Sequence, residues 1–104
     1  MSEIAQDSQR CDVFLFRARL FKSRSAAGQF IEKGAVRVEA GGAVRRLRRA
    51  AAPVRPGDTL VYMRSGSLVR LTILQLGERR GPASEAQQLY SLEPSLTAPG
   101  SDRS

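Results

Sequence analysis

Apolar residues near the start of the chain recur with the spacing of an amphipathic helix. They lie three or four positions apart, at Cys11, Phe14, Leu15, Ala18 and Phe21. This spacing gathers them on one side of a helix and leaves the other side polar. We therefore predict a first helix whose apolar side packs against the core. Phe14 and Phe21 belong to that side, whereas Phe16 lies off it and either fills a gap or stacks on a ligand.

The same spacing resumes a few residues later and predicts a second helix. Its apolar positions are Ala27, Phe30 and Ile31, followed by Gly34. Ser23 or Ser25 could accept a hydrogen bond from the first free amides of this helix. Gly34 suits the left-handed residue that commonly ends a helix.

Two short helices joined by so few residues must pack against each other with their apolar sides inward. The basic side chains between them are then left largely outside. These are Arg10, Arg17, Arg19, Lys22, Arg24 and Lys33. The first third of the chain is thus predicted to be a helical hairpin with a cationic outer surface.

Beyond the second helix the pattern changes to alternation. Residues 36–39 alternate apolar with polar, as a strand with one wet face does, and residues 40–43 read as a turn. The turn leads into residues 44–49, Val-Arg-Arg-Leu-Arg-Arg, the densest positive run in the chain. This run has two interpretations: it adds to a binding surface, or it is a solvated, partly disordered loop.

Two stronger strands and a short helix are predicted in the second half. Pro56 and Gly57 suit the middle of a tight turn. Strands are expected over 59–64 and 67–76, joined by a hairpin at 65–66. Residues 84–87, Ser-Glu-Ala-Gln, have the form of a capping box, which predicts a helix over 82–90. Its inner side would carry Ala86, Leu89 and Tyr90.

The chain of 104 residues has the size of one domain. We place that domain at 10–92 and expect disordered tails at 1–9 and 93–104, where periodicity is lacking. Residues 1–9 contain no apolar leader core, and no apolar run approaches the roughly 18 residues that cross a bilayer. We therefore expect a cytoplasmic protein with no membrane partner.

The residue content argues against an enzyme. The chain has no His and a single Cys, so imidazole catalysis, a disulfide and a thiolate metal cluster have no basis, and we expect no cofactor and no metal. Asp12, Asp58 and Glu85 each suit a structural role, at a helix start, a turn and a helix cap. Cys11 itself is interpreted as a small core residue.

Charge points instead to a polyanionic ligand. The net charge is +7, and 15 of the 17 basic residues are Arg. Between residues 10 and 55 there are 12 basic against 3 acidic residues, a balance of +9. The guanidinium fork binds phosphate with paired hydrogen bonds, and such a concentrated field favours nucleic acid. Charge alone also allows a solvated Arg-rich surface that reflects genomic base composition, a DNA-binding module or a basic protein-interaction module.

Several short motifs resemble a known family, the RNA-binding domain named after ribosomal small-subunit protein S4. They are Arg10-Cys11-Asp12-Val13, Ser23-Arg24 with Ala27 and Ile31, Gly34-Ala35-Val36-Arg37-Val38 and Pro56-Gly57-Asp58. Residues 18–24 and the late Arg-Arg-Gly-Pro-Ala-Ser-Glu-Ala at 79–86, with Leu89-Tyr90, are similar to the heat-shock-protein-15 subfamily of stand-alone, ribosome-associated S4 domains.

The resemblance implies an α+β fold, in which a two-helix hairpin packs on a small, mostly antiparallel sheet (the alpha-L RNA-binding motif) with a short C-terminal helix. It implies binding to structured RNA, namely ribosomal RNA of the large subunit and also transfer RNA. Separately, we expect a monomer. The implied task is the recycling of stalled subunits that still carry a nascent chain. By carry-over, the residues facing RNA are Arg10, Arg19, Lys22, Ser23, Arg24 and Arg37.

One position and one turn depart from the family pattern. Val13 stands where the family usually has Lys, and residues 39–42 replace the usual Asn-Gly turn. We hypothesise that the basic run compensates through Arg45, Arg46, Arg48 and Arg49. Together with Arg17 and Lys33, these residues complete the predicted RNA surface. Recognition would rest on shape and phosphates, because A-form grooves hide the base edges from side chains.

Overall fold

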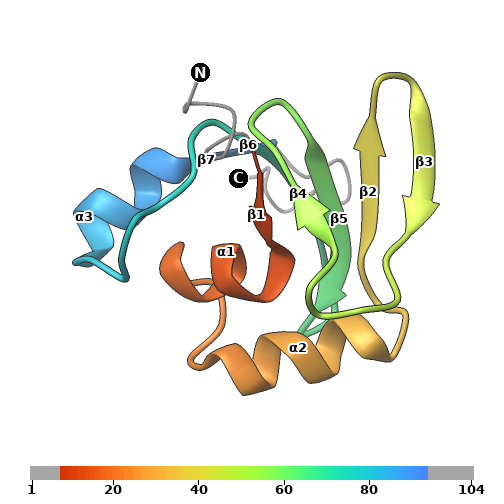
Figure 1. The fold of residues 1–104 in the computed structure, drawn as a ribbon, viewed down its shortest axis with the longest axis horizontal. Coiled ribbons are helices and arrows are strands. Elements are labelled where there is room, and N and C mark those ends of the chain that lie inside the picture. Colours follow the sequence, from red (N-terminus) through yellow and green to blue (C-terminus); the bar gives the residue numbers. More distant parts are fainter. Residues whose placement is uncertain (1–7, 94–104) are drawn as a thin grey trace.

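Two helices pack beside an antiparallel sheet, and two short strands outside that sheet pair with each other (Figure 1). The computed structural model describes residues 8–93. The elements in chain order are β1 (Gln9–Arg10), α1 (Cys11–Arg17), α2 (Arg24–Glu32), β2 (Arg37–Ala40), β3 (Ala43–Arg46), β4 (Pro53–Val54), β5 (Thr59–Arg64), β6 (Ser67–Ile73), α3 (Ala83–Ala86), a 3-10 turn (Gln87–Leu89) and β7 (Tyr90–Leu92). The predicted α+β class, with a helical hairpin on an antiparallel sheet, is confirmed.

The main sheet has five strands in the order β3-β2-β5-β6-β7, and every neighbouring pair is antiparallel. The predicted hairpin at 65–66 is present, with Arg64 opposite Ser67. A separate two-stranded ladder pairs β1 with β4, so that the residue before α1 lies beside a segment more than 40 residues later. Neither β1 nor β4 was predicted, because two residues carry no periodicity.

Helix α1 ends at Arg17, earlier than the apolar spacing through Phe21 suggested. The amide of Leu20 donates to the carbonyl of Leu15 and that of Arg19 to Phe16, the paired bonds of a Schellman motif. Arg19 takes the left-handed conformation, with φ of 61°, at the position where glycine is usual. The chain therefore leaves the helix before Phe21, which still reaches the core.

Helix α2 is fixed at both ends by residues that the sequence had indicated. Ser23, not Ser25, is the N-cap, and its hydroxyl accepts from the amide of Ala26 at 3.0 Å. At the other end Gly34 has φ of 81°, a conformation that a side chain would strain, and its amide donates to Ile31.

The basic run at 44–49 is an ordered strand and its continuation, so the interpretation as a partly disordered loop is wrong. Gly41 and Gly42 both have positive φ and form the tight turn between β2 and β3. All four residues of β3 are exposed, yet the next residue, Leu47, is buried in the core. The amide of Leu47 also donates to Val36, which holds the run against the start of β2.

The C-terminal elements differ from the prediction. Strand β6 ends at Ile73 instead of residue 76, and the helix predicted over 82–90 is split into α3, a 3-10 turn and β7. The N-cap is Pro82, so Ser84 lies inside the helix and the predicted capping box is wrong. Ala86 and Leu89 are buried as expected, whereas Tyr90 is only half-buried and pairs with Ile73.

The core lies between the helix pair and the sheet. Phe21, Phe30 and Tyr62 form an aromatic cluster with ring centroids 5.1 to 5.9 Å apart. Cys11 is fully buried, as predicted, and burial raises the pKa of its thiol to about 12, with a smaller contribution from Asp12. The thiol is thus a packing group of the core.

The predicted tails fall almost entirely outside the described residues. At the boundaries, Gln9 pairs with Val54 and the amide of Glu93 donates to Arg70, so ordered structure extends one residue beyond each end of the predicted 10–92 domain. Among residues 8–93, no helix has the length and apolar composition needed to span a bilayer.

Candidate nucleic-acid interface

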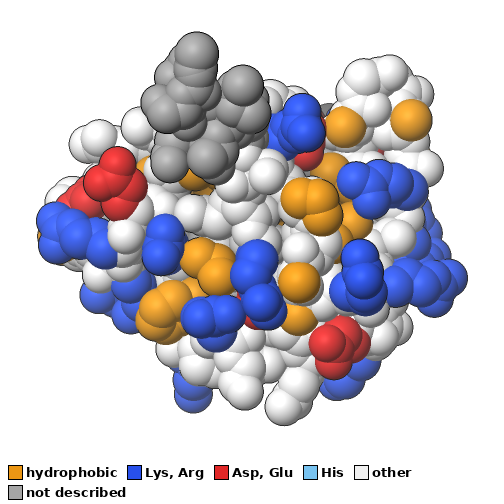
Figure 2. All heavy atoms as spheres, viewed as in Figure 1, with side chains coloured by type: hydrophobic (Ala, Val, Ile, Leu, Met, Phe, Trp, Pro, Cys, Tyr) orange, Lys and Arg blue, Asp and Glu red, His pale blue; other side chains and the backbone are white. Residues whose placement is uncertain are grey.

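Basic side chains extend across the lower half of the molecule as viewed in Figure 2, from the α3 side to the β3 side, and acidic groups interrupt them at few places. Most of the predicted site residues fall into three groups. They stand beside the buried carboxylate of Asp12, against the C-terminal loop, or around the end of α2. The number of N–H donors that each cation has free for a ligand depends on the group to which it belongs.

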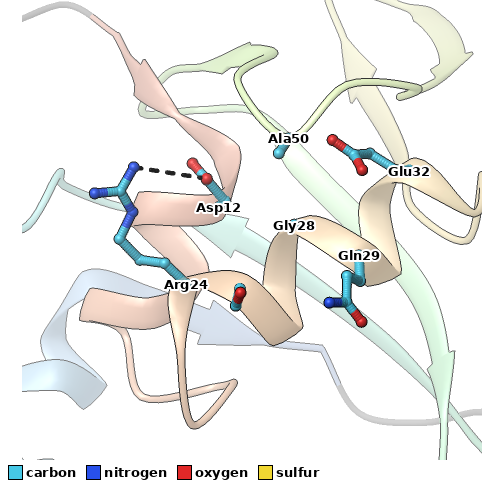
Figure 3. Close-up of a pocket in the computed structure, with 7 residues that line it drawn as sticks. Asp12, Arg24, Gly28, Gln29, Glu32 and Ala50 are labelled. Carbon is cyan, nitrogen blue, oxygen red and sulfur yellow. Dashed lines mark ion pairs between the residues drawn. The ribbon is translucent and has the colours of Figure 1, made fainter.

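The first group joins the starts of both helices. Arg10 binds Asp12 with two hydrogen bonds, Nε to Oδ1 at 3.0 Å and Nη2 to Oδ2 at 2.9 Å. Arg24, in the first turn of α2, places its Nη2 3.8 Å from the same Oδ2, the ion pair drawn in Figure 3. The hydrogen bonds to Asp12 also raise the pKa of Arg10, so this cation stays charged. Two predicted site residues are therefore brought together.

The second group faces the loop before α3. Arg17 donates to the carbonyl of Gly77 at 2.7 Å, and Arg19 donates to that of Gly81 at 2.6 Å. Part of each guanidinium is therefore used to hold the chain, although both groups keep further donors. Arg17 is half-buried and Arg19 exposed. Arg19 is thus better placed than Arg17 to meet a ligand.

The third group surrounds the end of α2. Arg46 donates through Nη1 to the carbonyl of Gly34, and Nη1 of Arg48 lies 3.9 Å from where a Cβ on Gly34 would be. Arg37 is opposite Arg46 in the β2–β3 ladder, and Lys33 is the C-cap residue of α2. Cations are favoured here because the free carbonyls at a helix C-terminus carry partial negative charge. The structure thus brings four predicted residues to one end of the hairpin.

The remaining predicted residues lie around these groups. Lys22 is exposed in the connection between the helices, next to Ser23, whose hydroxyl caps α2 and accepts an amide. Arg45 is exposed on β3, and Arg49 is exposed just beyond Leu47. Ser23 is accordingly a structural residue as well as a predicted contact.

Two arginines outside the predicted site pack on aromatic rings, and these contacts were not predicted from the sequence. The guanidinium of Arg64 lies 3.9 Å from the ring centroid of Phe21, and that of Arg80 lies 4.8 Å from Phe16. Arg80 also donates to the carbonyl of Phe16. Strand alternation would have placed Arg64 on the same side as Tyr62, but nothing local predicts the contact of Arg80. Phe16 therefore packs under a cation.

A pocket that is open to solvent lies beside Asp12. It has a volume of about 420 Å³, with Arg24 at one side, Glu32 at the other and Gly28 and Ala50 between (Figure 3). Within residues 8–93, no group of three or more His, Cys, Asp or Glu could hold a metal ion. The arrangement suits contacts with an extended anion across the surface.

Residues 9–39, which span β1, both helices and most of β2, match the family model of the S4 domain. This segment is an S4 RNA-binding domain. The match covers the first part of the predicted surface, from Arg10 to Arg37. Arg45, Arg46, Arg48 and Arg49 lie beyond the matched segment.

A solved structure is similar over nearly the whole chain. Heat shock protein 15 of Vibrio cholerae, described as trimeric, superposes with a TM-score of 0.75 at 26% sequence identity, covering 93% of this chain and 94% of that one. This chain is therefore like heat shock protein 15 in structure, including the elements after β2. A search of curated protein sequences found no significant match.

Proposed function

We propose that this S4 protein binds structured ribosomal RNA of the large subunit and acts in recycling subunits that stall with a nascent chain and its transfer RNA attached. The single observation that carries the proposal is the structural likeness to heat shock protein 15 over 93% of this chain. The ligand class follows from the S4 segment and its cations. The role is that of a binding module, not of an enzyme.

The arrangement of cations supports binding to a folded RNA. Arg10 and Arg24 stand at the starts of the two helices, and Lys33, Arg37 and Arg46 stand around the end of α2. Guanidinium groups held at fixed separations suit the regular phosphates of an A-form helix, whose deep groove side chains cannot read. Affinity would then depend on phosphate contacts and on the shape of the RNA.

Binding measured against salt concentration tests the ligand class. If about five phosphates are neutralised, log affinity for a ribosomal RNA hairpin falls with log salt at a slope of roughly −3.5 to −4.5. Fluorescence anisotropy with a labelled hairpin measures this slope, and competition with duplex DNA separates RNA from DNA. A nearly flat slope would exclude any polyanionic ligand. Equal competition by DNA would favour a general nucleic-acid module.

Sedimentation of a cell extract on a sucrose gradient tests the ribosomal assignment. We expect the protein to migrate with free large subunits and to become enriched there when translation is stalled. Recovery only at the top of the gradient would contradict the assignment while leaving RNA binding intact. The same protein analysed alone by light scattering tests our expectation of a monomer against the trimer described for the Vibrio cholerae protein.

A further inference from the structure

Asp12 is the one charged side chain that is buried among the described residues, with 4% of its surface exposed. It lies in the first turn of α1, where the positive end of the helix favours a carboxylate. A buried carboxylate needs partners, because burying an unpaired charge costs several kcal/mol. Both cations that meet it, Arg10 and Arg24, belong to the predicted RNA surface.

The two partners are about half exposed, although the carboxylate between them is buried. The side chains of Arg10 and Arg24 are 49% and 52% exposed, against 6% for Asp12. Arg10 has five N–H donors and spends two on the carboxylate. Arg24 stands at ion-pair distance from Oδ2. Each guanidinium therefore keeps donors on the solvent side, and the two groups converge on one oxygen from different elements.

We propose that Asp12 is a positioning residue that holds Arg10 and Arg24 together as one phosphodiester-binding site. The inference rests on the proposed RNA-binding function and adds how that surface is organised. The three groups together carry a net charge of +1, which still attracts a phosphate. Side-chain freedom that a free arginine would lose on binding is already lost in the folded protein.

A positioning role for Asp12 predicts the opposite effect on RNA affinity from the one that net charge alone predicts. If Asp12 were only a negative charge near the RNA, replacing it with Asn would raise the net charge of +7 by one and tighten binding. If Asp12 positions the arginines, Asp12→Asn weakens binding despite the more favourable charge. The sign of the change separates the two cases.

Glu32 provides a matched control. It lies on α2, lines the same pocket as Asp12 and is exposed, and it forms no ion pair within residues 8–93. Glu32→Gln removes the same charge from the same surface without touching either arginine. We expect Asp12→Asn to weaken binding to a ribosomal RNA hairpin about tenfold, and Glu32→Gln to leave it equal or slightly tighter.

A double-mutant cycle distinguishes positioning from loss of fold. In an Arg10→Gln, Arg24→Gln background, Asp12→Asn should change affinity by less than about twofold, because the groups it positions are gone. A purely structural role would lower affinity equally in both backgrounds. Circular dichroism melts set the temperature so that every variant is folded during the measurement.

A measurement without RNA tests the arrangement itself. In the wild-type protein the Arg10 Nε–H resonance should exchange slowly with solvent, and Asp12→Asn should make it exchange as fast as that of exposed Arg45. Glu32→Gln should leave it slow. Fast exchange in the wild type, or unchanged or tighter RNA binding by folded Asp12→Asn, would overturn the inference. Failure of the wild type to bind any structured RNA would instead overturn the proposed function.

Discussion

Single residues in this protein differ in role according to what lies beside them, even where their side chains are alike. Arg24 is half exposed beside Asp12, Arg17 is committed to the carbonyl of Gly77, and Arg80 covers the ring of Phe16. The sequence predicts that these residues are cationic and largely outside the core. Their ion-pair and hydrogen-bond partners lie 12 to 64 positions away, beyond the range of any local pattern.

Cys11 allows a prediction at the same scale. Its pKa is raised to about 12 by burial and, secondarily, by Asp12, whereas an unfolded thiol titrates near about 8.5. The folded state therefore favours the neutral thiol. Its contribution to stability is complete below pH about 8.5 and is lost as pH rises from there toward 12.

We accordingly expect iodoacetamide to alkylate Cys11 very slowly in the folded protein at pH 8.5 and rapidly in urea. Mass spectrometry at successive times measures both rates. The free energy of unfolding should also fall as pH rises above about 8.5, and a Cys11→Ala variant should show less of this fall. Equal alkylation rates in the two states would contradict the burial of the thiol.

Elements with a strong local pattern were predicted well, and short or nonlocal ones were not. The two helices and the β5–β6 hairpin carry clear periodicity and turn residues. Strands β1, β4 and β7 have two or three residues each and exist because of partners far along the chain. The break between α3 and β7 was missed because Leu89 keeps the helical spacing while Tyr90 pairs with Ile73.

The basic strand β3 depends on one apolar anchor. Leu47 is 1% exposed, whereas Val44 on the strand itself is 60% exposed. Leu47→Ala should lower the free energy of unfolding by about 2–5 kcal/mol, because it leaves a cavity in the core. Val44→Ala should change it by no more than about 0.5 kcal/mol. Urea unfolding measures both, and similar values for the two variants would show that Leu47 does not anchor the run.

At the scale of the whole molecule, the loop before α3 is fastened to the helical hairpin by arginines from both sides. Arg17 and Arg19 reach the loop from the hairpin, and Arg80 reaches back to Phe16. The segment that matches the S4 model ends at residue 39, yet its helices are held by hydrogen bonds to residues 77–81 in the second half of the chain. We call this set of contacts the brace. The resemblance of residues 79–86 to the heat-shock-protein-15 subfamily falls on this brace.

Neighbouring arginines test the brace. Arg80 donates to the carbonyl of Phe16 and covers its ring, whereas Arg79 is exposed and pairs with Glu85. Arg80→Ala should lower the free energy of unfolding by about 1–3 kcal/mol, since a charge-assisted hydrogen bond and a ring contact are lost. Arg79→Ala should have an effect of no more than about 1 kcal/mol. Thermal melts of the two variants compare them, and equal effects would argue against the brace.

The pairing of β1 with β4 and the arginine bonds to Gly77 and Gly81 also set an order of events during synthesis. A ribosome releases the helical hairpin first, but its supports emerge only after residue 81 has left the exit tunnel. The nascent hairpin therefore lacks these contacts until residue 81 has emerged. Until residue 81 is available, Arg17 and Arg19 have no loop carbonyls to bind, so the side of the hairpin that faces this loop is completed last.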